Sequence, residues 1–253
     1  MRGLGVATAI AVVAAAAAQL AAAVMTPLIG RALVEQAAAD GGEGVAAAFL
    51  VQAVGIFAAL AVLLVAGVLV IVWLWRARKN LDAFPGASAD LGAGWAIGGW
   101  FTPIANFVIP CRLMLQVARE SVHRRWVGPV VAVWWAAFLV YQCLGRLLEG
   151  DVPVDGTRDY GALSAYFDQE LLSGAVSALV FGVAGGCLAW LVYGVSRAQT
   201  DRIARGDVLH AYAAYAQAAY LQTAFPAADP SVTGIPADVP AGGQPAAGGT
   251  IQV

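Results

Sequence analysis

Four long stretches of the chain contain no Asp, Glu, Lys or Arg, and charged residues gather between them. A helix needs about 20 apolar residues to cross the ~30 Å hydrocarbon core of a bilayer, and each stretch reaches or exceeds that length. The pattern therefore predicts an all-α, polytopic integral membrane protein with four transmembrane helices. The predicted spans cover residues of about 4–29, 45–75, 126–148 and 171–195.

The first apolar stretch begins directly after Met1-Arg2, as a secretory signal peptide would. A signal peptide has an apolar region of only about 7–15 residues, whereas this stretch continues to Gly30. We therefore expect a retained first span. Pro27 and Gly30 predict the end of its helix, with a short charged loop up to Gly44.

A fifth uncharged stretch, residues 91–111, is interrupted by Gly98-Gly99, Pro103 and Pro110. A straight helix here would lose backbone hydrogen bonds at both prolines, and hydrocarbon offers no water to replace them. We therefore predict that this segment does not cross, and that it forms a re-entrant or interfacial hairpin.

The distribution of Lys and Arg supports this choice, because positive loops strongly prefer the cytoplasm. With four spans and both termini cytoplasmic, only Arg31, Arg146 and Arg158 of the 14 lie outside, whereas a fifth crossing would place eight outside. The predicted location is thus the cytoplasmic membrane, with a cytoplasmic N-terminus and C-terminus.

Residues 112–125 follow the hairpin and have the pattern of an amphipathic helix, with arginines among Leu and Val. Each positive charge near anionic headgroups contributes ~1 kcal/mol of attraction. We expect this stretch to contact lipid headgroups or an acidic partner through four residues, namely Arg112, Arg119, Arg124 and Arg125.

Beyond the fourth span, residues 206–225 predict a helix on the membrane face or on the cytoplasmic side. The last segment, residues 226–253, contains five of the 11 prolines and few large apolar residues. Such a composition cannot bury enough apolar surface to fold alone, which predicts a disordered tail.

The most specific motif lies in the hairpin. Paired glycines allow close backbone approach, prolines force turns, and Trp favours the membrane–water boundary. The hairpin could line a cavity, or it could be a structural element that seats the helix after it. The motif residues are Trp95, Gly98, Gly99, Trp100, Phe101, Pro103, Asn106 and Pro110.

This motif resembles the family named domain of unknown function 4328, which comprises small bacterial integral membrane proteins. Three further stretches support the resemblance: Trp75 to Asn80, the Trp134-Trp135 pair, and Ser196 to Gln199. The resemblance covers roughly residues 45–205 and implies a four-span core in a bacterial membrane. It implies no activity and therefore no catalytic residue.

A column of small residues at a spacing of four occurs in the fourth predicted span: Gly174, Ala178, Gly182 and Gly186. Such a column lets helices approach closely. We expect it to pack within the chain, with homodimerisation as the alternative.

The sequence contains no arrangement that predicts catalysis or cofactor binding. His123 and His210 are not in a metal-ligand spacing, and neither an active-serine elbow nor a phosphate-binding loop occurs. Apart from Arg146, one turn from the end of the third span, the strongly polar residues in the spans are Gln19, Gln52 and Gln142, which are expected to form interhelical hydrogen bonds. A net charge of −2 without a dense basic face argues against nucleic acid as a partner.

These observations predict a non-enzymatic membrane protein without a metal or cofactor. We expect it to scaffold or modulate a partner, either another membrane protein or a second copy of itself, through its cytoplasmic face. The alternative is a small permease or channel in which residues 95–110 line the pathway.

Overall fold

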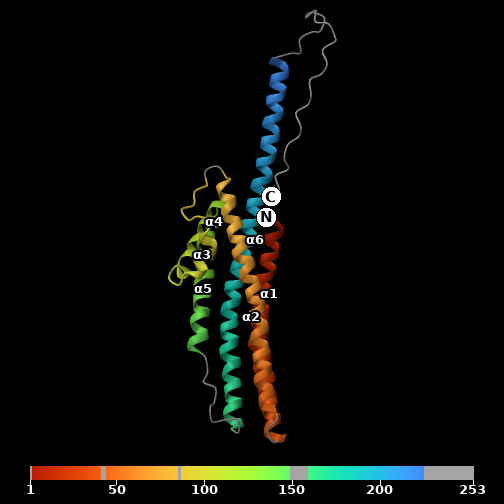
Figure 1. The fold of residues 1–253 in the computed structure, drawn as a ribbon, viewed down its shortest axis with the longest axis vertical. Helices are drawn as coiled ribbons and strands as arrows, with labels where there is room; N and C mark the ends of the chain where they lie inside the picture. Colours follow the sequence, from red (N-terminus) through yellow and green to blue (C-terminus); the bar gives the residue numbers. More distant parts are fainter. Residues whose placement is uncertain (1, 41–43, 85–86, 149–158, 225–253) are drawn as a thin grey trace, which may run out of the picture. The chain divides into compact units, whose positions relative to one another are not determined.

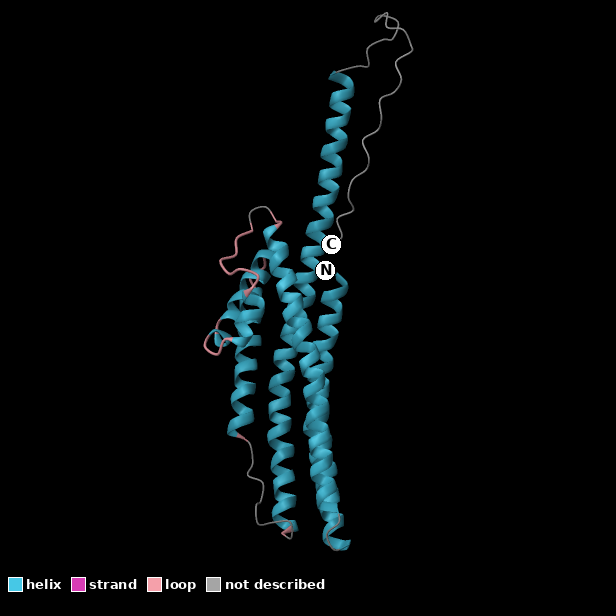
Figure 2. Cartoon of the chain, viewed as in Figure 1, coloured by secondary structure: helices cyan, strands magenta, loops and turns pink. Residues whose placement is uncertain are grey.

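A computed structural model of the chain describes residues 2–40, 44–84, 87–148 and 159–224, and these ranges contain helices and no strand (Figure 2). The four long helices are α1 (Arg2–Asp40), α2 (Gly44–Asp82), α5 (Val127–Leu147) and α6 (Tyr160–Ala224). Between α2 and α5 lie three short elements: α3 (Trp95–Phe101), the 3-10 turn η1 (Ala105–Phe107) and α4 (Ile109–Val122).

In the described part of the chain, four helices are long and apolar enough to cross a membrane: α1, α2, α5 and the Tyr160–Gly206 part of α6. Their outward faces are apolar, and on α2 alone Leu64, Val65 and Val68 are each 60% exposed. Exposure of such an apolar surface to water is unfavourable, whereas contact with lipid tails is not. The prediction of an all-α polytopic membrane protein is confirmed.

The chain divides into two compact units, Met1–Ile203 and Ala204–Val253. The helix predicted for residues 206–225 is present as far as Ala224, as the last part of α6 rather than as a separate element. Within it, Leu209, Tyr212 and Tyr220 are exposed. The predicted disordered tail, residues 226–253, lies outside the described residues.

Within the first unit, α1, α2 and α6 are longer than their predicted spans. The expectation that α1 ends near Pro27 and Gly30 is wrong, because the helix continues to Asp40. Gly30 lies against α6, where an added Cβ would come within 2.5 Å of the Phe167 ring.

A small core holds these extensions together, so tertiary packing overrides the local helix-breaking tendency of proline. Its buried residues are Val34, Ala37, Val45, Ala48, Leu163 and Phe167. The same packing explains why α6 begins at Tyr160, 11 residues before the predicted start of the fourth span.

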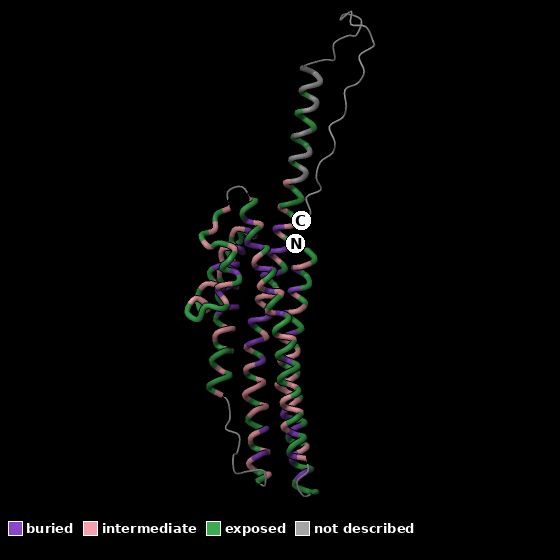
Figure 3. Tube along the Cα trace, in the orientation of Figure 1, coloured by how far each residue is buried: buried purple, intermediate pink, exposed green. Residues whose placement is uncertain are grey.

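The main core lies at the end of the bundle where α2 ends and α5 begins, which we call the α4 end (Figures 1 and 3). There α4 packs on α2 and α5. Its inward side chains are completely buried, as are several side chains opposite them: Leu113, Met114, Val117 and Ala118 of α4, with Trp73, Leu74 and Ala77 of α2.

The predicted column of small residues makes its close contact only at one end. An added Cβ on Gly174 would come within 3.3 Å of Ala23, and Ala178 is buried, but Gly182 and Gly186 have open space around them. A spacing of four rotates by about 40° per step around a helix with 3.6 residues per turn. Gly186 is therefore turned away, and Gly185 contacts α1 instead.

Candidate functional site

The candidate site is the hairpin that precedes α4, together with the polar side chains that fasten it to the bundle. Pro110 occupies the first turn of α4, where its missing N–H removes no hydrogen bond. At the other end of α4, His123 adopts a left-handed conformation (φ 53°) and its N–H donates to the Arg119 carbonyl at 3.1 Å. This turn reverses the chain, so that α4 and α5 lie side by side (Figure 1).

The turn between α3 and α4 lies well along α5. The Trp135 Nε1–H donates to the Phe107 carbonyl at 3.0 Å, and the Trp100 ring meets the rings of Trp135 and Phe138 edge-on. These two α5 residues follow Val127 by eight and eleven positions. At 1.5 Å per residue, the turn therefore lies about 12–17 Å from the start of α5.

The tip of the hairpin is apolar and uncovered. Phe101 is 76% exposed and Ile104 is 86% exposed, and Pro103, Phe107 and Val108 are exposed as well, as is Trp95 at the start of α3. A cluster of exposed large apolar side chains on a membrane protein is suited to contact with lipid.

Three motif residues are placed inside the hairpin. An added Cβ on Gly99 would come within 2.7 Å of Ile109, so α3 can approach α4 only because residue 99 is glycine, whereas Gly98 has open space. Within the described residues, Trp100 Nε1 and Asn106 Oδ1 are buried without a hydrogen-bond partner. The motif therefore combines packing residues, exposed apolar residues and two unsatisfied polar atoms, and its side chains include no titratable group.

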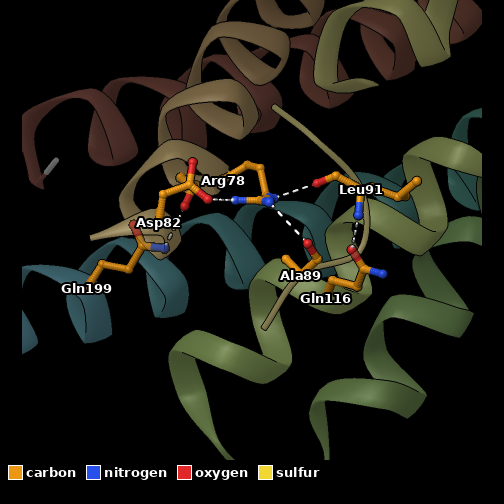
Figure 4. A network of polar contacts seen from close by, with 7 residues as sticks. Arg78, Asp82, Ala89, Leu91, Gln116 and Gln199 are labelled. Atoms are coloured by element: carbon orange, nitrogen blue, oxygen red, sulfur yellow. Dashed lines mark hydrogen bonds and ion pairs between the residues drawn. The ribbon is translucent and has the colours of Figure 1, made fainter. Parts of the chain in front are cut away.

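Arg78 fastens the segment before the hairpin to the end of α2 (Figure 4). Its guanidinium donates to the carbonyls of Leu91 at 2.6 Å and Ala89 at 3.2 Å, and to Asp82 Oδ1 at 2.5 Å. From α4, the Gln116 side chain accepts from the Leu91 N–H at 3.4 Å. The side chain of Arg78 is only 8% exposed, so it serves as a fixed clamp.

A second set of hydrogen bonds centres on Gln199 of α6, which is completely buried. Its Nε2 donates to the Ala77 carbonyl at 3.0 Å and to Ser121 Oγ at 2.9 Å, and its Oε1 accepts from Asn80 Nδ2 at 3.0 Å. One neutral amide thus joins α2, α4 and α6. Figure 4 shows Gln199 beside the Arg78 clamp.

A neighbouring contact brings α1 into the same assembly. The Trp73 Nε1–H donates to Ser196 Oγ at 2.8 Å, and an added Cβ on Gly5 would come within 2.0 Å of that oxygen.

A family model described as "Domain of unknown function (DUF4328)" matches residues 35–225. The chain belongs to this family. The resemblance predicted from the hairpin motif is therefore confirmed.

Comparison of this DUF4328 chain with curated proteins and with solved structures gives no match. Its geometry nevertheless explains why the motif stretches occur together. Residues 75–80 and 196–199 meet through the hydrogen bond between Asn80 and Gln199. Arg78 holds Leu91, just before residues 95–110, and Trp100 of the hairpin packs on Trp135 of the motif pair in α5. Together these stretches form the hairpin and the contacts that hold it to the helix bundle.

The four predicted arginines lie on the outside of this assembly. Arg112 is 3.5 Å from Asp90, with 56% of its side chain exposed, and Arg119, Arg124 and Arg125 are exposed. A cleft of about 320 Å³ on this surface is lined by Arg112 and Arg119 together with Ser88, Asp90, Gln116 and Glu120. The structure therefore presents a basic outer surface on a helix whose inner face is buried.

The sequence analysis placed Arg78 and Gln199 in stretches that support the family resemblance but gave them no role, and it did not single out Ser121 or Arg202. Arg202 donates to the Glu120 carbonyl at 3.4 Å and lies over the Phe84 ring at 4.5 Å. The available signal was the presence of polar residues directly after two apolar spans, which indicates a membrane boundary as readily as a network. Among the described residues, no group of three His, Cys, Asp or Glu side chains could hold a metal ion.

Proposed function

We propose that this DUF4328 protein is a non-enzymatic scaffold or modulator of a partner in the bacterial cytoplasmic membrane, and that it acts through its α4 end. In this proposal both termini and the α4 end face the cytoplasm, because the predicted loops there contain most of the Lys and Arg. The hairpin is re-entrant, with its apolar tip in the inner leaflet.

The observation that carries the proposal is the two-sided character of α4. Four inward side chains of this helix are completely buried, while Arg112 and Arg119 are exposed on the other side. The polar groups beneath it are engaged in hydrogen bonds with the backbone and with each other, as Gln199 and Arg78 illustrate. Such an arrangement holds a basic surface rigidly and offers no group for chemistry, which suits docking of an acidic segment of a partner protein.

Site-specific photo-crosslinking in intact membranes tests this proposal. A photoreactive residue in place of Leu115, which lines the cleft beside Arg112 and Arg119, would capture a partner. Replacing Arg112, Arg119, Arg124 and Arg125 by Gln should remove the crosslinked species, because the attraction to acidic groups is lost.

Replacing Arg31 by Gln serves as the matched control and should leave crosslinking unchanged, since Arg31 pairs with Glu35 and Asp168 far from α4. Crosslinks to lipid alone, or to a protein whose capture does not depend on the four arginines, would contradict the docking role.

A small permease or channel is the second candidate. A cavity of about 130 Å³ inside the bundle supports it, because Trp100 of the hairpin lines this cavity. Passage would require movement at the α4 end, where Trp73, Leu74 and Gln199 are completely buried. The scaffold proposal needs no such opening and is therefore preferred.

A further inference from the structure

The helix bundle holds an apolar cavity beside the hairpin. α2 packs against α3 and α4, and α5 packs against α4, but α2 and α5 do not pack directly against each other. Residues of both helices, together with residues of α1, α3 and α6, line a partly open cavity of about 130 Å³. One of these residues is Trp100 of the hairpin motif.

Small residues account for this space. Ala15 of α1, Ala66 of α2 and Ala184 of α6 are buried in the lining. An added Cβ on Gly185 would come within 3.3 Å of α1, whereas one on Gly67 would meet nothing within 4 Å. Gly67 therefore borders open space rather than a close helix contact. The aromatic part of the lining consists of Trp100, Trp134, Phe138 and Phe181.

The polar side-chain atoms of the lining are all hydrogen-bond donors. Trp100 and Trp134 each contribute an indole Nε1–H, and every other lining residue is Gly, Ala, Val, Leu, Ile or Phe. Within the described residues, Trp100 Nε1 is buried and has no hydrogen-bond partner. A buried donor without an acceptor is unfavourable, and a ligand with an acceptor oxygen would satisfy it. Asn106, which also has an unsatisfied atom, does not line this cavity.

The size and depth of the cavity restrict the ligand further. An engineered apolar cavity of about 150 Å³ in another protein holds benzene, so a cavity of about 130 Å³ is suited to a single ring. Trp134 and Phe138 follow Val127 by seven and eleven positions, which places them about 10–17 Å from the start of α5 at 1.5 Å per residue. That depth is close to the middle of a ~30 Å hydrocarbon core, where a charged group is costly. A neutral ligand is therefore required, which excludes a phospholipid, because its charged head group holds the ester carbonyls at the membrane surface.

We propose that the cavity binds the ring of a neutral, lipid-soluble quinone. A quinone has two acceptor oxygens and no donor, which complements a lining with two indole donors and no acceptor side chain. One carbonyl oxygen accepts from Trp100 Nε1–H, and the hydrocarbon substituents of the ring extend between α2 and α5 into lipid. Binding involves no electron transfer to or from the protein. The site does not use the arginines of α4, so its failure would leave the proposed docking function untouched.

Ligand binding to the full-length protein in phosphatidylcholine nanodiscs tests the site, with duroquinone as the probe. Its ring is fully substituted, so it does not add to the free cysteines. Durene has the same shape without the oxygens, and tetramethylhydroquinone has two hydroxyl donors. Uptake by empty nanodiscs is subtracted, and affinities are expressed per ligand concentration in the lipid. We expect saturable binding of duroquinone, about fivefold tighter than binding of durene or of the hydroquinone.

Tryptophan variants test the hydrogen bond. Trp100→Phe removes the donor, keeps an aromatic ring and should weaken duroquinone binding about fivefold, while durene binding should change less than about twofold. Trp190→Phe is the matched control, because Trp190 is exposed and does not line the cavity, and it should change neither. In protein with ¹⁵N-labelled tryptophan, the indole N–H resonance that is missing from Trp100→Phe should move to higher proton frequency as duroquinone is added.

Glycine variants locate the ring. Gly67→Phe should fill the cavity and abolish saturable binding of duroquinone and durene, since an added Cβ at Gly67 meets nothing within 4 Å. Gly145→Phe is the matched control, because Gly145 also has open space and does not line the cavity. Thermal unfolding checks that each variant is folded, and Gly67→Leu replaces Gly67→Phe if the larger side chain prevents folding.

Two kinds of result would contradict the proposal. Uptake that does not saturate, or binding that is equal in the Gly67 and Gly145 variants, would show partitioning into lipid only and would overturn the site. Equal weakening of duroquinone and durene in Trp100→Phe, tighter binding of the hydroquinone, or a Trp100 resonance that duroquinone does not move would overturn the assignment of the ligand as a quinone.

Discussion

Single side chains at the α4 end have structural roles that depend on full hydrogen bonding. Gln199 is the clearest example, because it is completely buried and its amide bonds to partners on both α2 and α4. A buried polar group left without its partner costs about 1–3 kcal/mol. Removing this amide would leave the Asn80 side-chain amide without its Gln199 partner and would take one hydrogen bond each from the Ala77 carbonyl and the Ser121 hydroxyl.

The Gln199→Leu variant should therefore be less stable by about 2–4 kcal/mol, as the lost partners of three neighbours add up only in part. Denaturant unfolding in detergent, followed by tryptophan fluorescence, measures the change. Gln142→Leu is the matched control, since Gln142 is exposed, and should change the free energy of unfolding by less than about 0.5 kcal/mol. Equal stability of the two variants would contradict the structural role of Gln199.

At the level of helices, the structure corrects where α1 ends and explains the correction by packing. Pro27 lies inside the helix, and the Thr26 hydroxyl donates to the Ala22 carbonyl at 2.7 Å next to it. Beyond Pro27, the close contact between Gly30 and Phe167 joins α1 to α6. The continuation of the helix thus depends on contact with a residue that lies far away in the sequence.

Gly30→Leu should therefore destabilise the protein by about 1–3 kcal/mol, because the Phe167 ring leaves no room for a side chain. Pro27→Ala should be neutral or stabilising, since alanine restores a helical N–H. Thermal unfolding of both variants in the same detergent gives the comparison. If Gly30→Leu left stability unchanged while Pro27→Ala lowered it, α1 would end near Pro27 as the local sequence suggests.

For the molecule as a whole, the two proposed functions differ in which parts of the protein lie in water. The hairpin tip is apolar and exposed, and it reaches about 12–17 Å along α5 from the start of that helix. A dry, lipid-covered tip is expected of a re-entrant scaffold, and a wet one is expected of a permease.

Thiol accessibility in intact cells separates these two arrangements, in a chain in which Cys111, Cys143 and Cys187 have been replaced. Single cysteines at Thr102 and Ile104 should resist a membrane-impermeant thiol reagent from both sides. Arg124→Cys should react only after the cytoplasmic face is opened, and Gln169→Cys should react from outside. Reaction of Thr102→Cys from outside would favour the permease, and reaction of Arg124→Cys from outside would reverse the proposed orientation.

The sequence by itself determined the all-α class, the number of long apolar helices and the family. These properties follow from local facts: about 20 uncharged residues predict a span wherever they occur, and the Trp/Gly/Pro motif is contiguous. The short elements between Trp95 and Val122 also agree with the prolines and glycines at which we expected a long helix to break.

Only the tertiary structure decided the lengths of α1 and α6, the use of Gly185 in place of Gly186, and the roles of Arg78 and Gln199. Each of these depends on a partner far away in the chain: Phe167 for Gly30, Ala16 for Gly185, and Asn80 and Ser121 for Gln199. Hydropathy is a property of each residue by itself and predicts whether a segment lies in lipid or in water. Hydrogen bonding and close packing depend instead on which residues the fold brings together.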